Sequence, residues 1–327
     1  MKHISIIVPQ GHSSLPNIDG AYQIFTEVNN LAQKLGNPAL FTIKLVGLSV
    51  EVGQRNGLFI VHPDCLIGEV AKTDLIIIPA MQGDLQLAIE RNTPFFPWII
   101  QSYRSGAELA SFCVGSFFLA ATGLLNGKQC ATHWSAAEQF RQLYPKVNLV
   151  DDKIITHEDK IYTSGGAYSF LNLLVYIIEK YAGREIAIMI AKIFMIDIDH
   201  TCQSPFILFQ GQKEHEDHDI KNAQLFIEGN YPDKITVDQL ATKFTIGRRS
   251  FERRFKKATN NTVIEYLQRV KIEAAKRSFE SSRKNISEVM FDVGYTDNKA
   301  FREVFKKITG LTPIEYRNKY NKQLLSW

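Results

Sequence analysis

The sequence has no uninterrupted apolar run of about 20 residues, the length that a membrane-spanning helix requires. Its N-terminal apolar stretch, residues 3–9, is too short for a signal peptide and is typical of a β-strand. Four scattered cysteines (Cys65, Cys113, Cys130 and Cys202) form no C-x-x-C pair and no zinc-type spacing. We therefore expect a cytoplasmic, reduced protein with no metal centre and no cofactor.

Positive charge is concentrated at one end of the 327-residue chain, which is long enough for two domains. From Asp219 onward there are 22 Lys and Arg against 13 Asp and Glu, a net charge of +9. The preceding residues carry 16 and 21, a net charge of −5. A basic third joined to an acidic remainder is typical of a region that contacts phosphates, whereas a merely solvated helix face would not need this asymmetry.

The basic region contains a helix, a tight turn and a second helix. Apolar residues in 286–293 recur at i, i+3, i+4 and i+7, as on one face of a helix. Gly294 then permits a reversal, and Asp297 suits the N-cap of the next helix. Phe301 and Phe305 begin the apolar stripe of that second helix. The segment therefore predicts a helix-turn-helix unit.

The same pattern occurs once earlier in the chain. Residues 251–259 (FERRFKKAT) match residues 301–309 (FREVFKKIT) at an offset of 50. The preceding apolar stripe, 237–244, matches 286–293 at an offset of 49, so the first turn is one residue shorter. A long helical run, 263–281, joins the two copies. We expect an all-α region with two helix-turn-helix units.

The second copy ends in GYTDNKAFREVFKKITGLTPIEYR (residues 294–317), which resembles the AraC/XylS family of bacterial transcription factors. This resemblance implies double-stranded DNA as the partner, with the second helix of each unit in the major groove. Burial of the phenylalanine face leaves polar residues pointing outward to bases or phosphates. The candidate base contacts are Arg249, Glu252, Arg253, Asn298, Lys299, Arg302 and Glu303. The candidate phosphate contacts are Arg248, Arg254, Lys256, Lys257, Lys306 and Lys307.

The N-terminal region alternates strands with helices, which predicts a doubly wound, mostly parallel α/β sheet. Residues 74–79 form the most apolar strand, as expected for one buried on both faces. The other expected strands are 3–9, 41–48, 58–61, 108–112, a short one ending at 131–134, and 160–163. The expected helices are 17–35, 96–105, 117–123, 135–143, 168–181 and 185–195.

Three ordered motifs, SFCVG, GLLNGKQCATHW and YTSGG, lie within residues 111–166. Together they resemble the PfpI-like branch of the class I glutamine-amidotransferase-like superfamily, over about residues 1–195. A PfpI-like half joined to an AraC-type half resembles the GlxA-type regulators. This resemblance implies a sensor and dimerisation domain at 1–200 and a DNA-binding domain at 220–327, and the segment 201–219, polar toward its end, is the expected linker. It also implies a homodimer and a small nitrogen-containing or amino-acid-like effector.

Cys113 is the residue best suited to chemistry or ligand contact, because it follows a strand and precedes a helix in a sharp elbow. Free N–H groups at the start of that helix are expected to lower the pKa of the thiol, and the open edge of an α/β sheet is where such folds bind ligands. The expected ligand-site residues, several of them placed by the resemblance, are Asn17, Asp19, Ala80, Met81, Cys113, Val114, His133, Trp134 and Gly165.

Catalysis by Cys113 is not expected, because its partners are missing. Val114 follows where catalytic relatives have a histidine, and Asn17 stands where they have an acid. Asparagine cannot act as a base. The main alternative, a thiol hydrolase or glyoxalase tethered to DNA, needs a carboxylate such as Asp19 beside the thiol.

Other interpretations remain open from the residues alone. The thiol could sense an oxidant, or Cys113 could be a small apolar packing residue. A further alternative is a DNA-binding scaffold whose N-terminal domain is inert and only dimerises, in which case the pocket around Cys113 would be filled. An amidotransferase would need a late His-x-Glu, to which His157-Glu158-Asp159, in a predicted polar turn, comes nearest. His215 and His218 could bind metal, although a charged linker explains them better.

Overall fold

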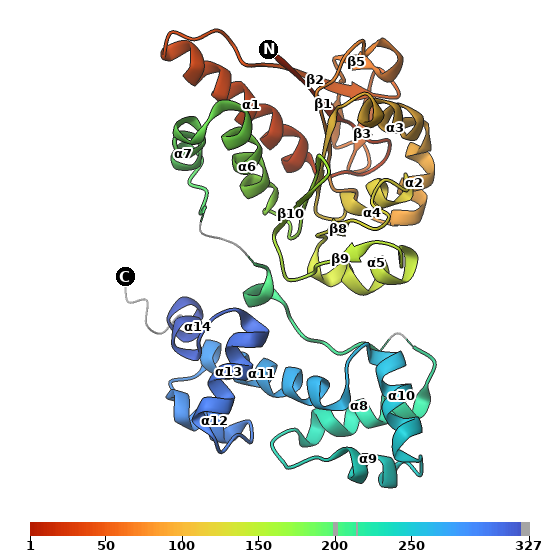
Figure 1. Ribbon diagram of the computed structural model, residues 1–327, viewed down its shortest axis with the longest axis vertical. Coiled ribbons are helices and arrows are strands. Elements are labelled where there is room, and N and C mark those ends of the chain that lie inside the picture. Colours follow the sequence, from red (N-terminus) through yellow and green to blue (C-terminus); the bar gives the residue numbers. More distant parts are fainter. Residues whose placement is uncertain (199–201, 214, 322–327) are drawn as a thin grey trace. The chain divides into compact units, whose positions relative to one another are not determined.

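The computed structural model describes residues 1–198, 202–213 and 215–321, and it divides the chain into two compact units, Met1–Gln203 and Ser204–Trp327. The first is an α/β unit and the second is helical (Figure 1). The boundary differs from the linker predicted at 201–219, because the residues after Gln203 pack on the helical unit. Among the described residues, no helix combines the length and apolar character needed to cross a bilayer.

A seven-stranded sheet in the order β10-β11-β7-β6-β1-β2-β5 forms the centre of the α/β unit. All neighbouring strands are parallel except β10 and β11. The strands are β1 (Lys2–Ile7), β2 (Phe41–Gly47), β5 (Cys65–Leu66), β6 (Leu75–Ile78), β7 (Glu108–Phe112), β10 (Ile155–Glu158) and β11 (Ile161–Ser164). Two small pairs of strands lie outside this sheet. β3 (Val52–Gln54) and β4 (Phe59–Val61) are antiparallel, and β8 (Gln129–Cys130) and β9 (Asn148–Leu149) are parallel.

Helices cover both faces of this sheet, as its apolar strands require, since every residue of β6 is buried. One face packs against α1 (Leu15–Lys34), α6 (Phe170–Ala182) and α7 (Arg184–Ile193). The other packs against α2 (Leu85–Asn92), α3 (Phe96–Arg104), α4 (Gly115–Ala121) and α5 (Ala137–Leu143). The predicted doubly wound, mostly parallel architecture is confirmed.

Two local expectations for this unit were wrong, and one helix was not predicted. The segment predicted as a polar turn places His157 and Glu158 in β10, and the turn is formed by Asp159 and Lys160, both with positive φ. The strand expected to reach Trp134 ends at Cys130. Helix α2 was not predicted, because its apolar stripe is short and interrupted by polar residues.

Within the described residues, the second unit contains a 3-10 turn at Ser204–Phe206 and seven α-helices. The α-helices are α8 (His218–Asn230), α9 (Val237–Lys243), α10 (Arg248–Thr259), α11 (Val263–Ser281), α12 (Ile286–Asp292), α13 (Asn298–Thr309) and α14 (Pro313–Tyr320). They build two cores that share the long helix α11. Its first half contributes Tyr266 and Val270 to one core, and its second half contributes Ala275 and Phe279 to the other. Tyr231 packs against both cores. The two predicted helix-turn-helix units, α9–α10 and α12–α13, therefore rest on one shared support.

The two turns share a left-handed residue at the position that follows the first helix. Gly294 has φ of +74°, and Thr245, at the matching position, adopts the left-handed conformation with φ of +56°. The second turn makes a close contact, since a Cβ at Gly294 would overlap the carbonyl oxygen of Pro232. The Lys271 ammonium of α11 donates to the Gly294 carbonyl oxygen at 3.0 Å. Gly294 therefore joins the second turn both to α11 and to the segment that follows α8.

We expect Gly294→Ala to destabilise the helical unit by about 2–4 kcal/mol, because left-handed strain and overlap with Pro232 act together. Urea unfolding followed by far-UV circular dichroism measures this loss. Gly36→Ala, with φ of +78° and open space around it, is the control for the conformational strain alone and should lose about 1–2 kcal/mol. Equal losses in the two variants would contradict the close contact.

Candidate nucleic-acid interface and effector site

The second helix of each helix-turn-helix unit buries one face through two phenylalanines. Phe251 and Phe255 on α10, and Phe301 and Phe305 on α13, are fully buried. The two helices have the same order of buried and exposed positions from the first phenylalanine onward. Asp297 caps α13 by accepting from the Ala300 N–H at 2.6 Å, as predicted. Equivalent packing thus leaves equivalent outward faces on the two helices, which are called the recognition helices below.

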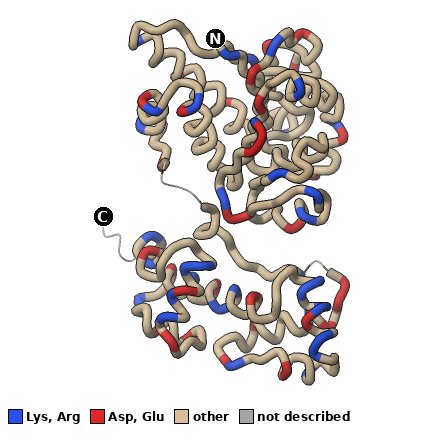
Figure 2. The backbone as a smooth tube through the Cα atoms, in the orientation of Figure 1, with Lys and Arg blue, Asp and Glu red and all other residues tan. Residues whose placement is uncertain are grey.

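All the predicted base contacts, and the phosphate candidates Arg248, Lys256 and Lys306, lie on exposed positions of the recognition helices. Figure 2 shows Lys and Arg recurring along α10. Arg248 bonds to Asp238 at 3.0 Å, and Lys256 lies 3.6 Å from Glu265. Exposed pairs of this kind contribute little, about 0–1 kcal/mol, so both cations can exchange their partners for phosphates.

Arg254 does not belong to this surface, contrary to its predicted role as a phosphate contact. Its guanidinium donates to both carboxylate oxygens of Asp217, at 2.8 and 2.6 Å, and to Asp219 at 2.8 Å. Hydrogen bonds from Arg254 hold the pKa of Asp217 below its usual value. Asp217 also caps α8 through the Ile220 N–H. Arg254 therefore ties α10 to the start of α8, a structural role that its repeat partner Val304 cannot have.

His215 is also engaged within the helical unit. Its Nε2 lies 2.9 Å from the Gln224 amide oxygen, and its Nδ1 lies 3.2 Å from the Asp217 N–H. Both ring nitrogens thus face protein partners, and His218 begins α8. The H-x-x-H spacing is accounted for by the packing of the segment onto this helix.

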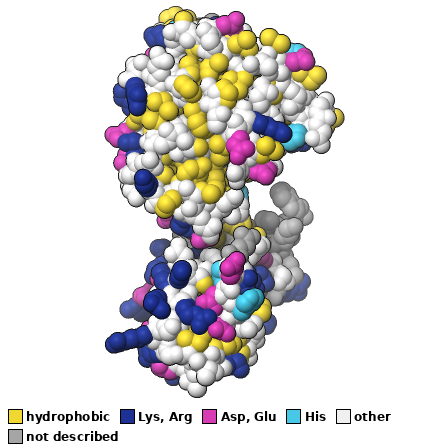
Figure 3. Space-filling model, turned by 90° about the vertical axis from the view of Figure 1, so that its right-hand side faces the viewer, with side chains coloured by type: hydrophobic (Ala, Val, Ile, Leu, Met, Phe, Trp, Pro, Cys, Tyr) yellow, Lys and Arg dark blue, Asp and Glu magenta, His cyan; other side chains and the backbone are white. Residues whose placement is uncertain are grey.

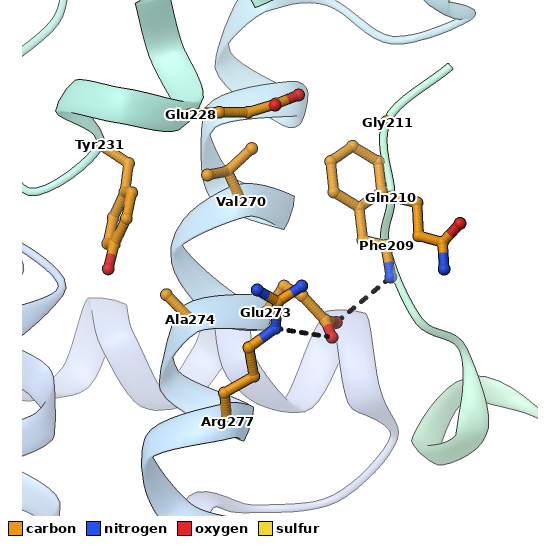
Figure 4. Close-up of a pocket in the computed structure, with 9 residues that line it drawn as sticks. All are labelled: Phe209, Gln210, Gly211, Glu228, Tyr231, Val270, Glu273, Ala274 and Arg277. Carbon is orange, nitrogen blue, oxygen red and sulfur yellow. Dashed lines mark hydrogen bonds and ion pairs between the residues drawn. The ribbon is translucent and has the colours of Figure 1, made fainter. Parts of the chain in front are cut away.

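A cavity of about 320 Å³ lies in the helical unit between the chain before α8 and helices α8 and α11. Figure 4 shows Phe209, Gln210 and Gly211 on one side of it and Tyr231 on the other. Val270, Ala274 and Glu273 of α11 lie between them. No sequence pattern indicated this cavity, because residues far apart in the chain line it.

The α/β unit forms the predicted elbow at Cys113. This residue has φ of +53°, and its N–H donates to the Ser164 carbonyl oxygen at 2.9 Å. Gly115 begins α4 so close to β6 that a Cβ would lie 2.7 Å from the Pro79 carbonyl oxygen. The thiol is buried, and burial raises the pKa of Cys113 to about 11. The elbow therefore holds a protonated thiol, opposite to the activation expected at a helix start.

Asn17 and the chain after β6 form a second side of the elbow. The Asn17 amide oxygen accepts from the Ala80 N–H at 3.1 Å, and the Ser14 N–H donates to the Ala80 carbonyl oxygen at 2.8 Å. Met81 is buried and forms an isolated bridge with Ser13. Within the described residues, the Asn17 amide nitrogen is buried with no hydrogen-bond partner.

The third side of the elbow is the chain after β8. Thr132 accepts from the Ser116 hydroxyl at 2.8 Å and donates to the Cys113 carbonyl oxygen at 3.3 Å. His133 turns its Nδ1 to the Ser135 hydroxyl at 2.7 Å, and its ring lies 5.4 Å from that of Trp134. Burial lowers the pKa of His133. Thr132, which the sequence did not single out, is thus the residue of this segment that contacts the elbow.

Asp19 lies away from these groups. It is exposed on α1 and accepts from Gln23 at 2.7 Å. Two positions along a helix are about 200° apart, so Asp19 and the buried Asn17 face opposite sides. Asp19 instead lines a separate cavity of about 350 Å³, together with Tyr22 and His62. A register shift that would bring this carboxylate to the thiol is not observed.

His157 is also displaced from the elbow. It pairs with Tyr162 across the β10–β11 hairpin, and their rings stack with centroids 4.2 Å apart. The elbow lies at the other end of β11, where Ser164 pairs with Phe112. Because β10 is one strand further out, the His157-Glu158 pair does not supply the partner that an amidotransferase would need.

Gly165 and the half-buried Val114 complete the predicted set, but the most informative residue here was missed. Gln203 is buried, and its amide nitrogen donates to the Thr132 carbonyl oxygen at 3.0 Å. A Cβ at Gly165 would overlap that nitrogen. No sequence pattern indicated Gln203, since it lies within the predicted linker.

Comparisons with known proteins agree with both units. A family model described as a helix-turn-helix domain matches residues 240–319, and a DJ-1/PfpI family model matches residues 24–180. The chain joins a DJ-1/PfpI domain to an AraC-type helix-turn-helix domain. It is a DNA-binding transcriptional regulator.

Curated relatives of this regulator are transcriptional regulators from Pseudomonas aeruginosa. It is 26% identical to ArgR over 219 residues, which cover 67% of this chain and 66% of ArgR. It is 24% identical to GbdR over 272 residues, which cover 82% of this chain and 72% of GbdR. The alignments therefore span about two thirds to three quarters of these relatives.

Two solved structures share the fold of the α/β unit. A candidate transcriptional regulator from Vibrio parahaemolyticus superposes with a TM-score of 0.53 at 21% identity, covering 59% of this chain and 98% of that one. A ThiJ/PfpI family protein from Pseudomonas syringae gives a TM-score of 0.51 at 17% identity, covering 76% of this chain and 90% of that one. At these identities the likeness extends to the fold alone.

For this regulator we expect Arg253→Ala to change the preferred base, because a bidentate arginine contact contributes about 1–3 kcal/mol of discrimination. Lys306→Ala should instead weaken all DNA sequences similarly and reduce the salt slope of binding by about one. Fluorescence anisotropy with a panel of duplexes at several salt concentrations separates these effects.

Lys34→Ala, on α1 of the α/β unit, is the matched control and should change neither property. Equal weakening of every duplex by both recognition-helix variants would contradict the assignment of Arg253 to base contact.

Proposed function

We propose that the α/β unit binds a small effector at the elbow and thereby controls DNA binding by the helical unit. The observation that carries this proposal is a set of buried polar atoms at the carboxyl ends of parallel strands, where α/β sheets bind ligands. Among the described residues, these atoms have no hydrogen-bond partner: Asn17 Nδ2, Ser111 Oγ, Ser164 Oγ and Gln203 Oε1. Each such atom costs about 1–3 kcal/mol, which a polar ligand would recover.

The donors and acceptors around the elbow favour binding over thiol chemistry. Asn17 offers an amide where an acid would be needed, and Asp19 lies on the opposite side of α1. His133 is engaged with Ser135, and the Cys113 thiol is held in its protonated form. A neutral polar site suits recognition of a metabolite, and it disfavours both a thiol hydrolase and an oxidant sensor, since the thiolate is the reactive species in each.

We expect Cys113 to react slowly with iodoacetamide at pH 7. A pKa raised from 9.0 to about 11 lowers the thiolate fraction about a hundredfold, and labelling should accelerate as the pH rises toward 11. Mass spectrometry of the modified peptides measures the rates, with the half-buried Cys202 as an internal reference. Rapid, pH-independent labelling of Cys113 would revive the thiol interpretations.

Dimerisation is proposed through the β3–β4 hairpin. Leu58, Phe59 and Ile60 are 71%, 46% and 56% exposed there. Hydrophobic side chains also gather on one face of the α/β unit (Figure 3). A two-stranded ribbon with open edges and apolar side chains is a surface that a second copy can cover. We propose that a homodimer buries it and brings two helical units to one operator.

Substitution of both Phe59 and Ile60 by Lys should convert the dimer to a monomer, because charged side chains oppose burial of the ribbon. Light scattering coupled to gel filtration measures the mass. Leu143→Lys, at a 55% exposed position on α5, is the control and should leave the dimer intact.

The proposed function is tested by a thermal-shift screen of amines and amino acids on the full chain, because a ligand that binds the folded state raises its melting temperature. Compounds that raise the melting temperature should also change DNA affinity. Asn17→Leu should weaken the binding of these compounds, because it removes the unpartnered Asn17 amide donor. Hits that are insensitive to Asn17→Leu and Cys113→Ser would place the effector elsewhere.

A further inference from the structure

The last residue of the α/β unit fills a cradle of three carbonyl oxygens. Gln203 is 2% exposed. Its amide nitrogen donates to the main-chain oxygens of Thr132 at 3.0 Å, Asp151 at 3.2 Å and Lys153 at 2.9 Å. A primary amide has two hydrogens, so three acceptors share two donors. The cradle therefore offers more acceptors than Gln203 can satisfy.

This cradle adjoins the elbow through Thr132. The Thr132 hydroxyl donates to the Cys113 carbonyl oxygen, while its own carbonyl oxygen accepts from Gln203. Gly165 makes room for the amide, since a Cβ there would overlap its nitrogen and lie 2.6 Å from the Thr132 oxygen. The Gln203 amide oxygen is buried without a partner among the described residues. Gln203 thus occupies the cradle with an incomplete set of hydrogen bonds.

The residues immediately after Gln203 are attached to α11 in the helical unit. Residues 204–211 are called the strap here, and within it Pro205 is buried. The Lys276 ammonium donates to the Ile207 carbonyl oxygen, and the Phe209 N–H donates to Glu273 at 3.3 Å. Lys276 and Glu273 lie on α11, the helix that both recognition units share. The chain therefore runs from the cradle to the common support of the DNA-binding helices within a few residues.

A cavity borders the strap where it crosses α11. Phe209, Gln210 and Gly211 border the cavity of about 320 Å³ on the side opposite Tyr231 (Figure 4). The strap also packs on the first helical core through Phe209, whose ring lies 5.1 Å from that of Tyr266 on α11. A displacement at Gln203 would therefore change both the polar contacts and the packing of the strap on α11.

We propose that the cradle is the site for a nitrogen-bearing group of the effector and that Gln203 is its built-in competitor. A primary ammonium, a guanidinium or an amide presents two or more N–H donors to the three carbonyl oxygens and displaces the Gln203 side chain. The released strap then shifts on α11 and changes DNA affinity. This inference rests on the proposed function and adds the site that would bind the effector's nitrogen-bearing group and the route by which binding is transmitted.

Gln203→Ala in the full chain empties the cradle and tests its chemistry. Acetamide and methylammonium should raise the melting temperature of this variant more than that of the unsubstituted protein. Tetramethylammonium, which has no N–H, should have no such effect. Gln203→Glu is a second variant of nearly the same shape, whose carboxylate is repelled by the three oxygens. Absence of any difference between N–H donors and tetramethylammonium in Gln203→Ala would overturn the cradle assignment.

The same variants test transmission to DNA. Both should change affinity for an operator duplex in the same direction by about fivefold or more, the lower end of typical allosteric coupling. Acetamide should fill the cradle of Gln203→Ala without restoring affinity, because it is not joined to the strap. Gln210→Ala, an exposed glutamine of the strap, is the matched control and should bind DNA normally.

Unchanged affinity in both Gln203 variants, or an equal change in Gln210→Ala, would refute transmission through Gln203. These outcomes differ from failure of the proposed function. One outcome is that the Gln203 variants behave as expected while Asn17→Leu and Cys113→Ser leave the thermal shifts of the metabolite hits unchanged. That result would refute effector binding at the elbow and support the cradle. If Asn17→Leu and Cys113→Ser weaken the thermal shifts but the Gln203 variants bind ligands and DNA like the unsubstituted protein, only the role of Gln203 as a competitor is refuted.

Discussion

The DNA-binding surface depends on two pairs of phenylalanines buried against one shared helix. Phe255 meets the ring of Tyr266 at 5.4 Å, and Phe305 meets the ring of Phe279 at 5.7 Å, in both cases edge to face. Because each pair is spaced four residues apart, it fixes which side of the recognition helix faces the core. Every outward residue is placed by this packing rather than by its own contacts. The support shared through α11 then makes two separate recognition helices act as one body within the helical unit.

In the α/β unit, too, apolar packing positions the polar residues of the site. Fully apolar strands such as β6 position the elbow, while the groups that line it are polar but carry no charge. The buried Cys113 thiol is protonated and Asn17 takes the place of an acid. Removal of ionised groups from a buried site avoids the large desolvation penalty that a thiolate and a carboxylate would each incur. The elbow has therefore kept the geometry of a ligand-binding fold without the charges that thiol catalysis requires.

Periodic and local features were predictable from the sequence, and pairings between distant residues were not. The recognition helices followed from apolar spacing and from the Asp297 cap, and the exposed positions of Arg249 and Arg302 followed from that spacing in turn. The role of Arg254 could not be predicted from apolar spacing, since its partner Asp217 lies 37 residues away. Gln203 was missed for the same reason, because its acceptors lie 50 to 71 residues earlier in the chain. Side chains that satisfy distant main-chain oxygens leave no periodic signal.

The helical unit also extends further toward the N-terminus than its matched family segment, residues 240–319. Lys276 is 2% exposed, and its ammonium is satisfied by Glu273 and by the Ile207 carbonyl oxygen of the strap. Loss of a partner of a buried charge is strongly destabilising. Arg254 likewise needs Asp217, which precedes α8. Residues that appeared to be a linker therefore complete the charge balance of α11 and α10, so a change in the strap alters the electrostatic environment of the helices that contact DNA.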